Sequence, residues 1–231
     1  MSGHYEKDGI KFPRVTSIIS DCNGSKEGLL QWSANEAIRW LRENMTAYDT
    51  TNINGPHYKV CESDLQQARY AYKDTSRIAL DVGSEVHRAI EDFLKGKPAV
   101  LTTVFAENSF DAFLEWKSKN NLEVIALEQT VWGDRWAGTA DCICLLNGKK
   151  YVIDWKTSKA FYMTEMGAQI AAYRSCLPDV EGSGILRLDK ETGMPHWKDF
   201  SKRYERDLAV FNAMVSLYYL KHKLIAKRFE K

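Results

Sequence analysis

The chain has 231 residues, of which 44% are hydrophobic and 27% are charged; this composition is typical of a folded globular protein and excludes a wholly disordered chain. No apolar run approaches the roughly 18–20 residues that span a bilayer, and the opening MSGHYEKDGIKF lacks targeting character, so neither a membrane partner nor a targeting segment is predicted. The five cysteines are an odd number, scattered along the chain, which favours reduced thiols and a cytoplasmic location.

The formal net charge of +1 is unevenly distributed along the chain. Residues 198–231 carry nine Lys and Arg side chains against four Asp and Glu. Such a basic segment suits a polyanionic partner, because phosphate binding depends on local rather than global charge. A solvated helix face explains the same pattern equally well, so charge alone leaves the partner open.

Helical periodicity dominates the first half of the chain, after the short segment FPRVTSIIS, which favours an extended conformation. The segment TTNINGPHY is predicted to be a loop, from its Asn, Gly and Pro content. We expect the longest helix of this half to be broken near Gly83. The predicted helices cover about residues 27–43, 62–94 and 104–119.

In the second half the hydrophobic period changes from 3.6 to 2 residues. Three strands are predicted in LEVIALEQTVW, RWAGTADCICLL and KYVIDWKTS, with turns at GD and NGK. A helix over about residues 164–177 follows them. Two further strands, GILRLD and HWKDF, and a helix over about 204–229 complete the predicted elements.

This order of elements predicts an α/β protein, with helices on both faces of a small mixed sheet. No repeat and no Pro- or Gly-rich linker separates two domains. We therefore expect one compact unit, in which residues 1–80 form an N-terminal helical extension that packs on a core of residues 81–231.

Two carboxylates occupy strands that should otherwise be buried. Alternate residues of a strand share a face, so Asp154 and Lys156 point the same way. Pairing around the NGK turn can bring Asp141, on the neighbouring strand, close to Asp154. Two ionised carboxylates at such short range repel each other unless a cation lies between them. A hard divalent ion such as Mg²⁺ prefers such oxygen ligands.

The sequence contains an internal control for this argument. The tripeptide Glu115-Trp116-Lys117 has the same D/E-x-K pattern as Asp154-Trp155-Lys156, but its neighbours follow a helical period. On a helix, Glu115 and Lys117 point about 200° apart and cannot act together. The strand context and the upstream Asp141 therefore make the second tripeptide specific.

Asp141, twelve intervening residues and then Asp154-Trp155-Lys156 resemble the PD-(D/E)XK nuclease superfamily. Three further segments are similar to its RecB-type exonuclease branch. They are DVGSEVHRAIEDFL, with its G-x-x-x-H motif on Gly83 and His87; GAQIAAY, with Q-x-x-x-Y on Gln169 and Tyr173; and EQTVWGDRWAGTAD, with Glu128 ahead of the first acid. The opening KDGIKFPRVTSIIS…LLQW also resembles phage and mitochondrial single-strand exonucleases of this type.

The resemblance implies a restriction-endonuclease-like core and a role for each matched residue. Asp141 and Asp154 would hold one or two Mg²⁺ or Mn²⁺ ions, with His87 and the backbone carbonyl of Trp155. Lys156 would orient or help deprotonate the attacking water and neutralise developing charge. Cys176 is the last cysteine, whereas the iron–sulfur members of this branch carry a late cysteine cluster, so no iron–sulfur cluster is expected.

The roles of four matched residues stay open at this point. His87 lies beside an apolar stripe, where a lone histidine is more often structural than a metal ligand. Glu128 is either an acid at the metal or an ordinary strand charge. Gln169 would orient the lysine or a DNA phosphate, and Tyr173 is as well explained by helix packing.

The resemblance implies a metal-dependent DNA exonuclease that acts on ends and prefers single strands, in phage recombination or DNA repair. The alternatives are a duplex exonuclease, a structure-specific endonuclease, or a nucleic-acid-binding protein that does not cleave. The expected partners are DNA ends and a single-strand-binding or recombination protein. We expect the N-terminal extension, with Trp32, Trp40 and Tyr72, to cover the site so that a strand must thread its end. The candidate DNA-binding residues are Lys159, Lys202, Arg203, Lys221 and Lys223.

Overall fold

The computed structural model describes residues 4–22, 27–45, 47–49 and 57–222. The chain divides into two compact units, one of Met1–Asn23 with Val82–Lys231 and the other of Gly24–Asp81. The first unit contains the sheet and both of its helical layers, and the second is built from helices and a short hairpin.

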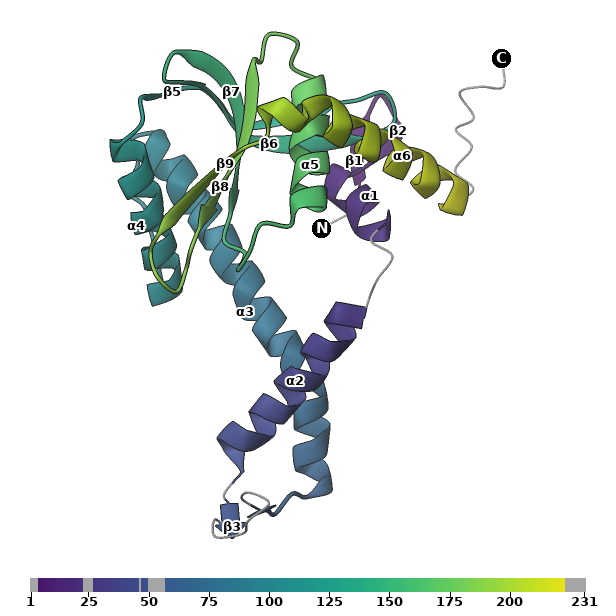
Figure 1. Ribbon diagram of the computed structural model, residues 1–231, viewed down its shortest axis with the longest axis vertical. Coiled ribbons are helices and arrows are strands. Elements are labelled where there is room, and N and C mark those ends of the chain that lie inside the picture. Colours follow the sequence, from purple (N-terminus) through teal and green to yellow (C-terminus); the bar gives the residue numbers. More distant parts are fainter. Residues whose placement is uncertain (1–3, 23–26, 46, 50–56, 223–231) are drawn as a thin grey trace. The chain divides into compact units, whose positions relative to one another are not determined.

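A five-stranded mixed sheet forms the centre of the first unit (Figure 1). The parallel pair is β7 with β8, and the other neighbours are antiparallel. Asn147 and Gly148, with φ of 51° and 83°, form the tight turn predicted for the NGK segment. The strands, in spatial order, are β5 (Leu122–Trp132), β6 (Ala137–Leu146), β7 (Lys149–Lys156), β8 (Gly182–Leu188) and β9 (Pro195–Asp199).

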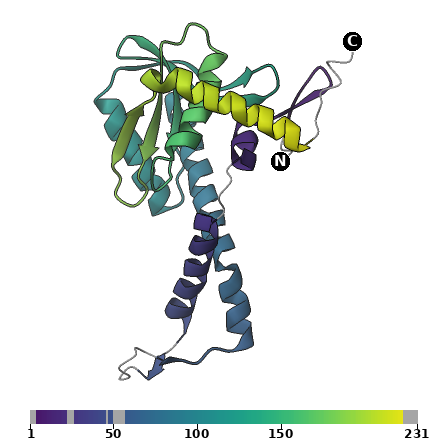
Figure 2. The same ribbon diagram turned by 45° about the vertical axis from the view of Figure 1, so that its right-hand side comes forward.

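Helices cover both faces of this sheet. On one face α5 (Met163–Ser175), α6 (Tyr204–His222) and α1 (Val15–Cys22) enclose an apolar core, and Figure 2 shows α6 running across α5. On the other face α4 (Val104–Ser118) and the C-terminal part of α3 (Glu62–Leu94) enclose a second core around Trp155 and Phe113. The predicted fold class, an α/β protein with a small mixed sheet between helices, is confirmed, and it is compatible with a restriction-endonuclease-like core.

Three local predictions were wrong in whole or in part. Within the predicted loop TTNINGPHY, His57–Tyr58 is a short strand that pairs with Ala47–Asp49, and residues 50–56 lie outside the described residues. Tertiary packing explains the other two. Val15–Cys22 is a helix rather than an extended segment, because Val15, Ile18 and Ile19 lie at helical spacing and are all buried. The helix α3 continues through Gly83 without a break. A Cβ at Gly83 would lie 3.3 Å from Oγ1 of Thr157, so the glycine permits a close helix–strand approach and does not end the helix.

Residues 1–23 belong to the sheet unit and not to the N-terminal extension in which we placed them. The hairpin of β1 (His4–Lys7) and β2 (Ile10–Pro13) is followed by a bridge between Arg14 and Ala137 of β6. The helix α1 then packs against α5 and α6. The division at residue 80 therefore separates segments that share one core.

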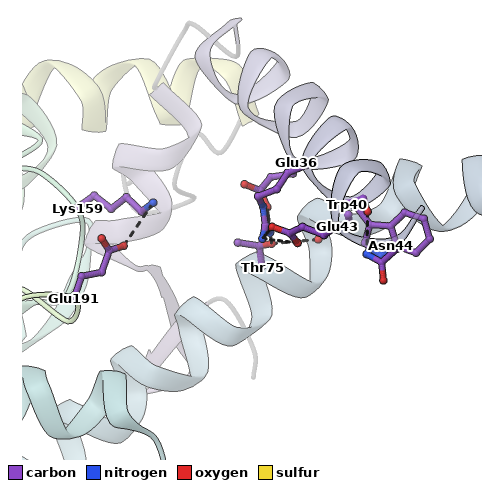
Figure 3. Close-up of polar contacts among 9 residues, drawn as sticks. Glu36, Trp40, Glu43, Asn44, Thr75, Lys159 and Glu191 are labelled. Atoms are coloured by element: carbon purple, nitrogen blue, oxygen red, sulfur yellow. Dashed lines mark hydrogen bonds and ion pairs between the residues drawn. The ribbon is translucent and has the colours of Figure 1, made fainter. Parts of the chain in front are cut away.

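The second unit contains α2 (Glu27–Asn44), the N-terminal part of α3, and the paired strands β3 (Ala47–Asp49) and β4 (His57–Tyr58). Polar contacts join its two helices: Thr75 of α3 donates a hydrogen bond to Glu36 of α2 at 2.7 Å (Figure 3) and accepts one from Arg39 of α2 at 3.2 Å. Trp32 and Tyr72 meet edge to face, with ring centroids 6.3 Å apart. The two aromatic side chains thus pack on each other within this unit.

Two predicted properties concern the whole chain. All five cysteines are free thiols. Within the described residues, none of the helices has an apolar stretch long enough to cross a membrane. The predicted C-terminal helix extends to His222 in α6, and its last predicted residues, 223–229, lie outside the described residues.

The packing of α5 on α6 makes Gly167 sensitive to substitution. A Cβ there would lie 2.6 Å from Oδ2 of the buried Asp207, so we expect Gly167→Ala to destabilise the protein by about 1–3 kcal/mol. Gly28→Ala, in α2, is the matched control because its Cβ would meet nothing within 4 Å. Denaturant unfolding of both variants measures the difference, and equal stabilities would contradict this account of the interface.

Candidate metal centre

The site lies where β6 and β7 separate. Their pairing runs from Leu146 and Lys149 to Cys142 and Ile153, so the next row would place Asp141 opposite Asp154. At that row Oδ2 of Asp141 accepts a hydrogen bond from the Trp155 amide at 2.8 Å. The side chain thus satisfies a backbone donor where the strand ladder ends. Asp141 and Asp154 are 7% and 1% exposed.

A third carboxylate extends this row across β5. The pairs Leu127–Cys142 and Gln129–Ala140 place Glu128 opposite Asp141. Glu128 has a φ of 49°, a left-handed conformation that costs a residue other than glycine about 1–3 kcal/mol. Three acids therefore occupy one row of three neighbouring strands, and one of them does so at the expense of backbone strain.

A connected polar group surrounds Asp154. Its Oδ2 lies 2.5 Å from Nζ of Lys156, two residues along the same strand, as the sequence pattern predicted. Its Oδ1 accepts a hydrogen bond from Nε2 of Gln169 at 2.9 Å, and the same nitrogen lies 3.0 Å from the hydroxyl of Tyr173. The Q-x-x-x-Y segment of α5 therefore contacts the strand acid directly.

His87 reaches the row of acids from α3, on the other face of the sheet. Its Nδ1 lies 3.4 Å from Oδ2 of Asp141, and it also hydrogen-bonds the backbone carbonyl of Trp155. Gly83, one turn earlier on α3, allows the helix to approach Thr157. The G-x-x-x-H spacing is thus explained by one close contact and one functional side chain.

His87, Glu128 and Asp141 each offer a ligand atom, and these atoms lie within 4.8 Å of one another. Ligands bound to one ion at about 2.0–2.6 Å lie at most about 4–5 Å apart, so the three residues fit a single divalent cation. The carboxylate oxygens suit Mg²⁺ or Mn²⁺, and the imidazole also suits transition metals such as Zn²⁺, so the set fits several divalent ions. Asp154 is not a member of this group among the described residues, and its two oxygens contact Lys156 and Gln169.

The electrostatics of the site indicate a shortage of positive charge. Burial and the Asp154 carboxylate raise the pKa of Asp141 well above its usual range. Burial and the Asp141 carboxylate raise the pKa of Glu128 to about 7. Burial lowers the pKa of His87, which favours the neutral imidazole that binds metals. A bound cation would favour the ionised forms of Asp141 and Glu128 and would bind the neutral imidazole of His87.

Lys156 is held in its charged form. Burial acts to lower its pKa, but the carboxylates of Asp154 and Asp141 outweigh burial, and the pKa of Lys156 is raised. The ammonium can therefore donate hydrogen bonds and stabilise negative charge. It is poorly suited to remove a proton from water near neutral pH.

The predicted DNA-binding residues have different environments. Lys159 is exposed and lies 3.8 Å from Glu191 (Figure 3), and Lys202, in the short helix η1 (Ser201–Arg203), is also exposed. Arg203 is bonded to Asp207 at 2.9 Å and to the Met163 carbonyl, which indicates a packing role. Lys221 pairs with Asp21 at 2.7 Å. Lys223 lies outside the described residues.

Arg187 is a basic residue near the site that the sequence did not single out. It pairs in register with Lys156 across the parallel strands, so the two cations share one face of the sheet. It is 8% exposed, and Nη1 donates to the Ser158 carbonyl at 3.3 Å and to Asp189 at 3.0 Å. A single arginine within the apolar run GILRLD was the available signal.

Comparison with known proteins leaves the family open. Neither the protein-family models nor the curated proteins include a match. A solved structure described as the crystal structure of SSO0001 is similar to this chain with 14% identity and a TM-score of 0.34, and the similarity covers 84% of this chain and 88% of that one. A functional conclusion must therefore rest on the chemistry of the site.

Substitution of Asp141 and substitution of Asp154 should change the stability of the metal-free protein in opposite directions. Asp141→Asn keeps an acceptor for the Trp155 amide and removes a buried charge, so we expect the Tm at pH 7.5 in EDTA to rise by about 2–4 °C, near 1 kcal/mol. Asp154→Asn removes the partner of Lys156 and should lower the Tm by several degrees. Thermal unfolding checks both, and shifts of the same sign would contradict the environments described above.

The gain in stability of the metal-free protein from Glu128→Gln should depend on pH. An acid whose pKa is raised by folding ionises first in the unfolded chain, so the metal-free wild type loses stability as pH rises from about 4.5 through 7. The stability difference between Glu128→Gln and the wild type should be absent near pH 4 and grow to a plateau above pH 7. It should stay below about 1 kcal/mol because the side chain is partly exposed. A difference that does not change with pH would refute the raised pKa.

Proposed function

We propose that the protein is a Mg²⁺- or Mn²⁺-dependent nuclease that hydrolyses phosphodiester bonds from DNA ends and prefers single strands. One observation carries the proposal: Glu128, Asp141 and Asp154 converge where β6 and β7 separate, beside His87 and the charged Lys156. The motif resemblance to RecB-type exonucleases points the same way. The absence of any helicase motif in the sequence means that a partner would have to unwind duplex DNA.

The residues divide the chemical work between holding a cation and stabilising charge. His87, Glu128 and Asp141 would hold the divalent ion, which when bound lowers the pKa of water and offsets charge on the scissile phosphate. Lys156 supplies a fixed ammonium that can donate to the attacking water or to a phosphate oxygen. Gln169 and Tyr173 keep Asp154, and through it Lys156, in place.

The buried carboxylates of the site favour cleavage of DNA over binding alone. A protein that only bound DNA would gain nothing from buried carboxylates, because burial disfavours their ionised forms and those forms repel phosphate. A duplex exonuclease and a structure-specific endonuclease on the same site remain alternatives. A single-strand-binding or recombination protein is the kind of partner that would supply ends, and the free thiols suit the cytoplasm.

Lys156 and Lys117, the lysines of the two D/E-x-K tripeptides, provide a matched test of the role proposed for Lys156. Lys156→Ala removes the ammonium 2.5 Å from Asp154 and should lower the cleavage rate by about 10²–10⁴-fold. Lys117→Ala, on α4, should lose almost none, because its ammonium lies over the Phe93 ring. Gel assays on a labelled single strand with Mg²⁺ compare them, and similar losses would rule out the assignment of Lys156.

Removal of the ion, or of the acid that holds Lys156 in place, should stop cleavage without stopping DNA binding. We expect EDTA and Asp154→Asn each to abolish measurable turnover, while Ca²⁺ supports binding with little cleavage. Mg²⁺-dependent cleavage by purified Asp154→Asn, with contaminating nuclease excluded, would overturn the proposed function.

The preference for ends is tested with substrate topology. We expect linear single strands to be degraded to short products and closed circular single strands to survive under the same conditions. Affinity for the single strand should fall steeply between 50 and 200 mM salt, because phosphate contacts release counterions. Rapid linearisation of the circle would show an endonuclease and would remove the end requirement.

A further inference from the structure

The hairpin β1–β2 lies beside the N-terminal part of β6, residues 137–141, which does not pair with β7. Arg14 bridges to Ala137, and the hydroxyl of Tyr5 lies 2.6 Å from Oγ1 of Thr139. Thr139 is two residues before Asp141. The hairpin therefore contacts the strand that carries the central acid of the metal centre.

The hairpin also places an aromatic group around Trp132, the last residue of β5. Tyr5 and Phe12 meet the Trp132 ring edge to face, with centroid distances of 5.9 and 5.4 Å. The ammonium of Lys7 lies 5.4 Å above the same ring. An open hollow of about 320 Å³ adjoins this group, lined by Lys7, Asp8, Phe12, Trp132, Gly133 and Asp134.

Trp132 and the metal centre share one side of the sheet. Along β6, Asp141, Thr139 and Ala137 alternate onto one face, and Trp132 pairs with Ala137. Ala137 lies four residue steps along the strand from Asp141, on the order of 13 Å. A nucleic-acid strand with its phosphate at the metal centre could therefore reach the hollow with a base a few nucleotides away.

We propose that the hollow beside Trp132 is a subsite for one unpaired nucleobase of the strand whose phosphate occupies the metal centre; this inference rests on the proposed nuclease function. The indole offers a surface for stacking, which every base can use. Asp8 and Asp134 disfavour a phosphate in the hollow, but they can accept hydrogen bonds from the N–H groups of a base. The site thus takes the base and leaves the phosphates outside.

The test measures whether the contribution of one base to the affinity depends on the side chain of Trp132. Asp154→Asn serves as the non-cleaving background, and a single abasic nucleotide is moved along a dye-labelled single-stranded oligonucleotide in Ca²⁺. With Trp132 present, one position near the end should lose about 5- to 150-fold in affinity, the range for one stacked base. With Trp132→Ala added, that position should lose its special sensitivity, and Trp132→Phe should restore most of it.

Phe105→Ala is the matched control, because Phe105 is an exposed aromatic on α4, outside the hollow. It should leave the position-dependent pattern unchanged. If Trp132→Ala merely loosened the hairpin, affinity would fall equally at all abasic positions, and that result would overturn the subsite. An unchanged pattern in Trp132→Ala would overturn it as well.

The outcomes also separate the subsite from the proposed function. Wild-type cleavage with no coupling between Trp132 and any base would remove the subsite and keep the nuclease. Coupling without wild-type cleavage in Mg²⁺ would keep the nucleobase subsite and remove the nuclease. Failure of the non-cleaving variant to bind any single strand would overturn the subsite directly.

Discussion

The hydrogen bond from the Trp155 amide to Asp141 lies at the point where two strands of the sheet separate, and the site depends on that separation. In an unbroken ladder the amide would bond to backbone, and the side chains at this row would pack against neighbours. Here the acid satisfies the amide, and β6 continues toward the hairpin β1–β2 while β7 continues beside β8. The separation brings residues from both faces of the sheet to one place.

Helices on the two faces contribute different parts of the site. The helix α3 presents His87 to Asp141, and α5 presents Gln169 to Asp154. Both contacts need a close approach of helix and strand. Gly83 allows α3 to come near Thr157, and a Cβ at Gly138 of β6 would lie 2.5 Å from the Tyr173 ring. Glycine at these two positions therefore serves the site rather than a turn.

In the absence of a cation, the acids of the site lower the stability of the folded protein. Asp141 and Glu128 are held where their ionised forms are disfavoured, and Glu128 also carries a strained backbone. Such groups lower stability and persist where function requires them. The pairing of Asp154 with Lys156 relieves one acid of the row only, and a cation bound beside Asp141 and Glu128 would offset the charge of the other two.

Local patterns in the sequence determined the five strands of the central sheet, most helices and the face shared by Asp154 and Lys156, because alternation and helical period depend on neighbours along the chain. Tertiary structure decided what depends on contacts between distant segments. It made α3 continuous through Gly83, buried Val15–Cys22 as a helix, grouped Glu128 with His87 and Asp141, and placed Tyr5 against Thr139 and Trp132. Apart from the helical spacing of Val15, Ile18 and Ile19, none of these follows from local periodicity, because strand register, close helix approach and side-chain burial arise only when segments far apart in the chain pack together.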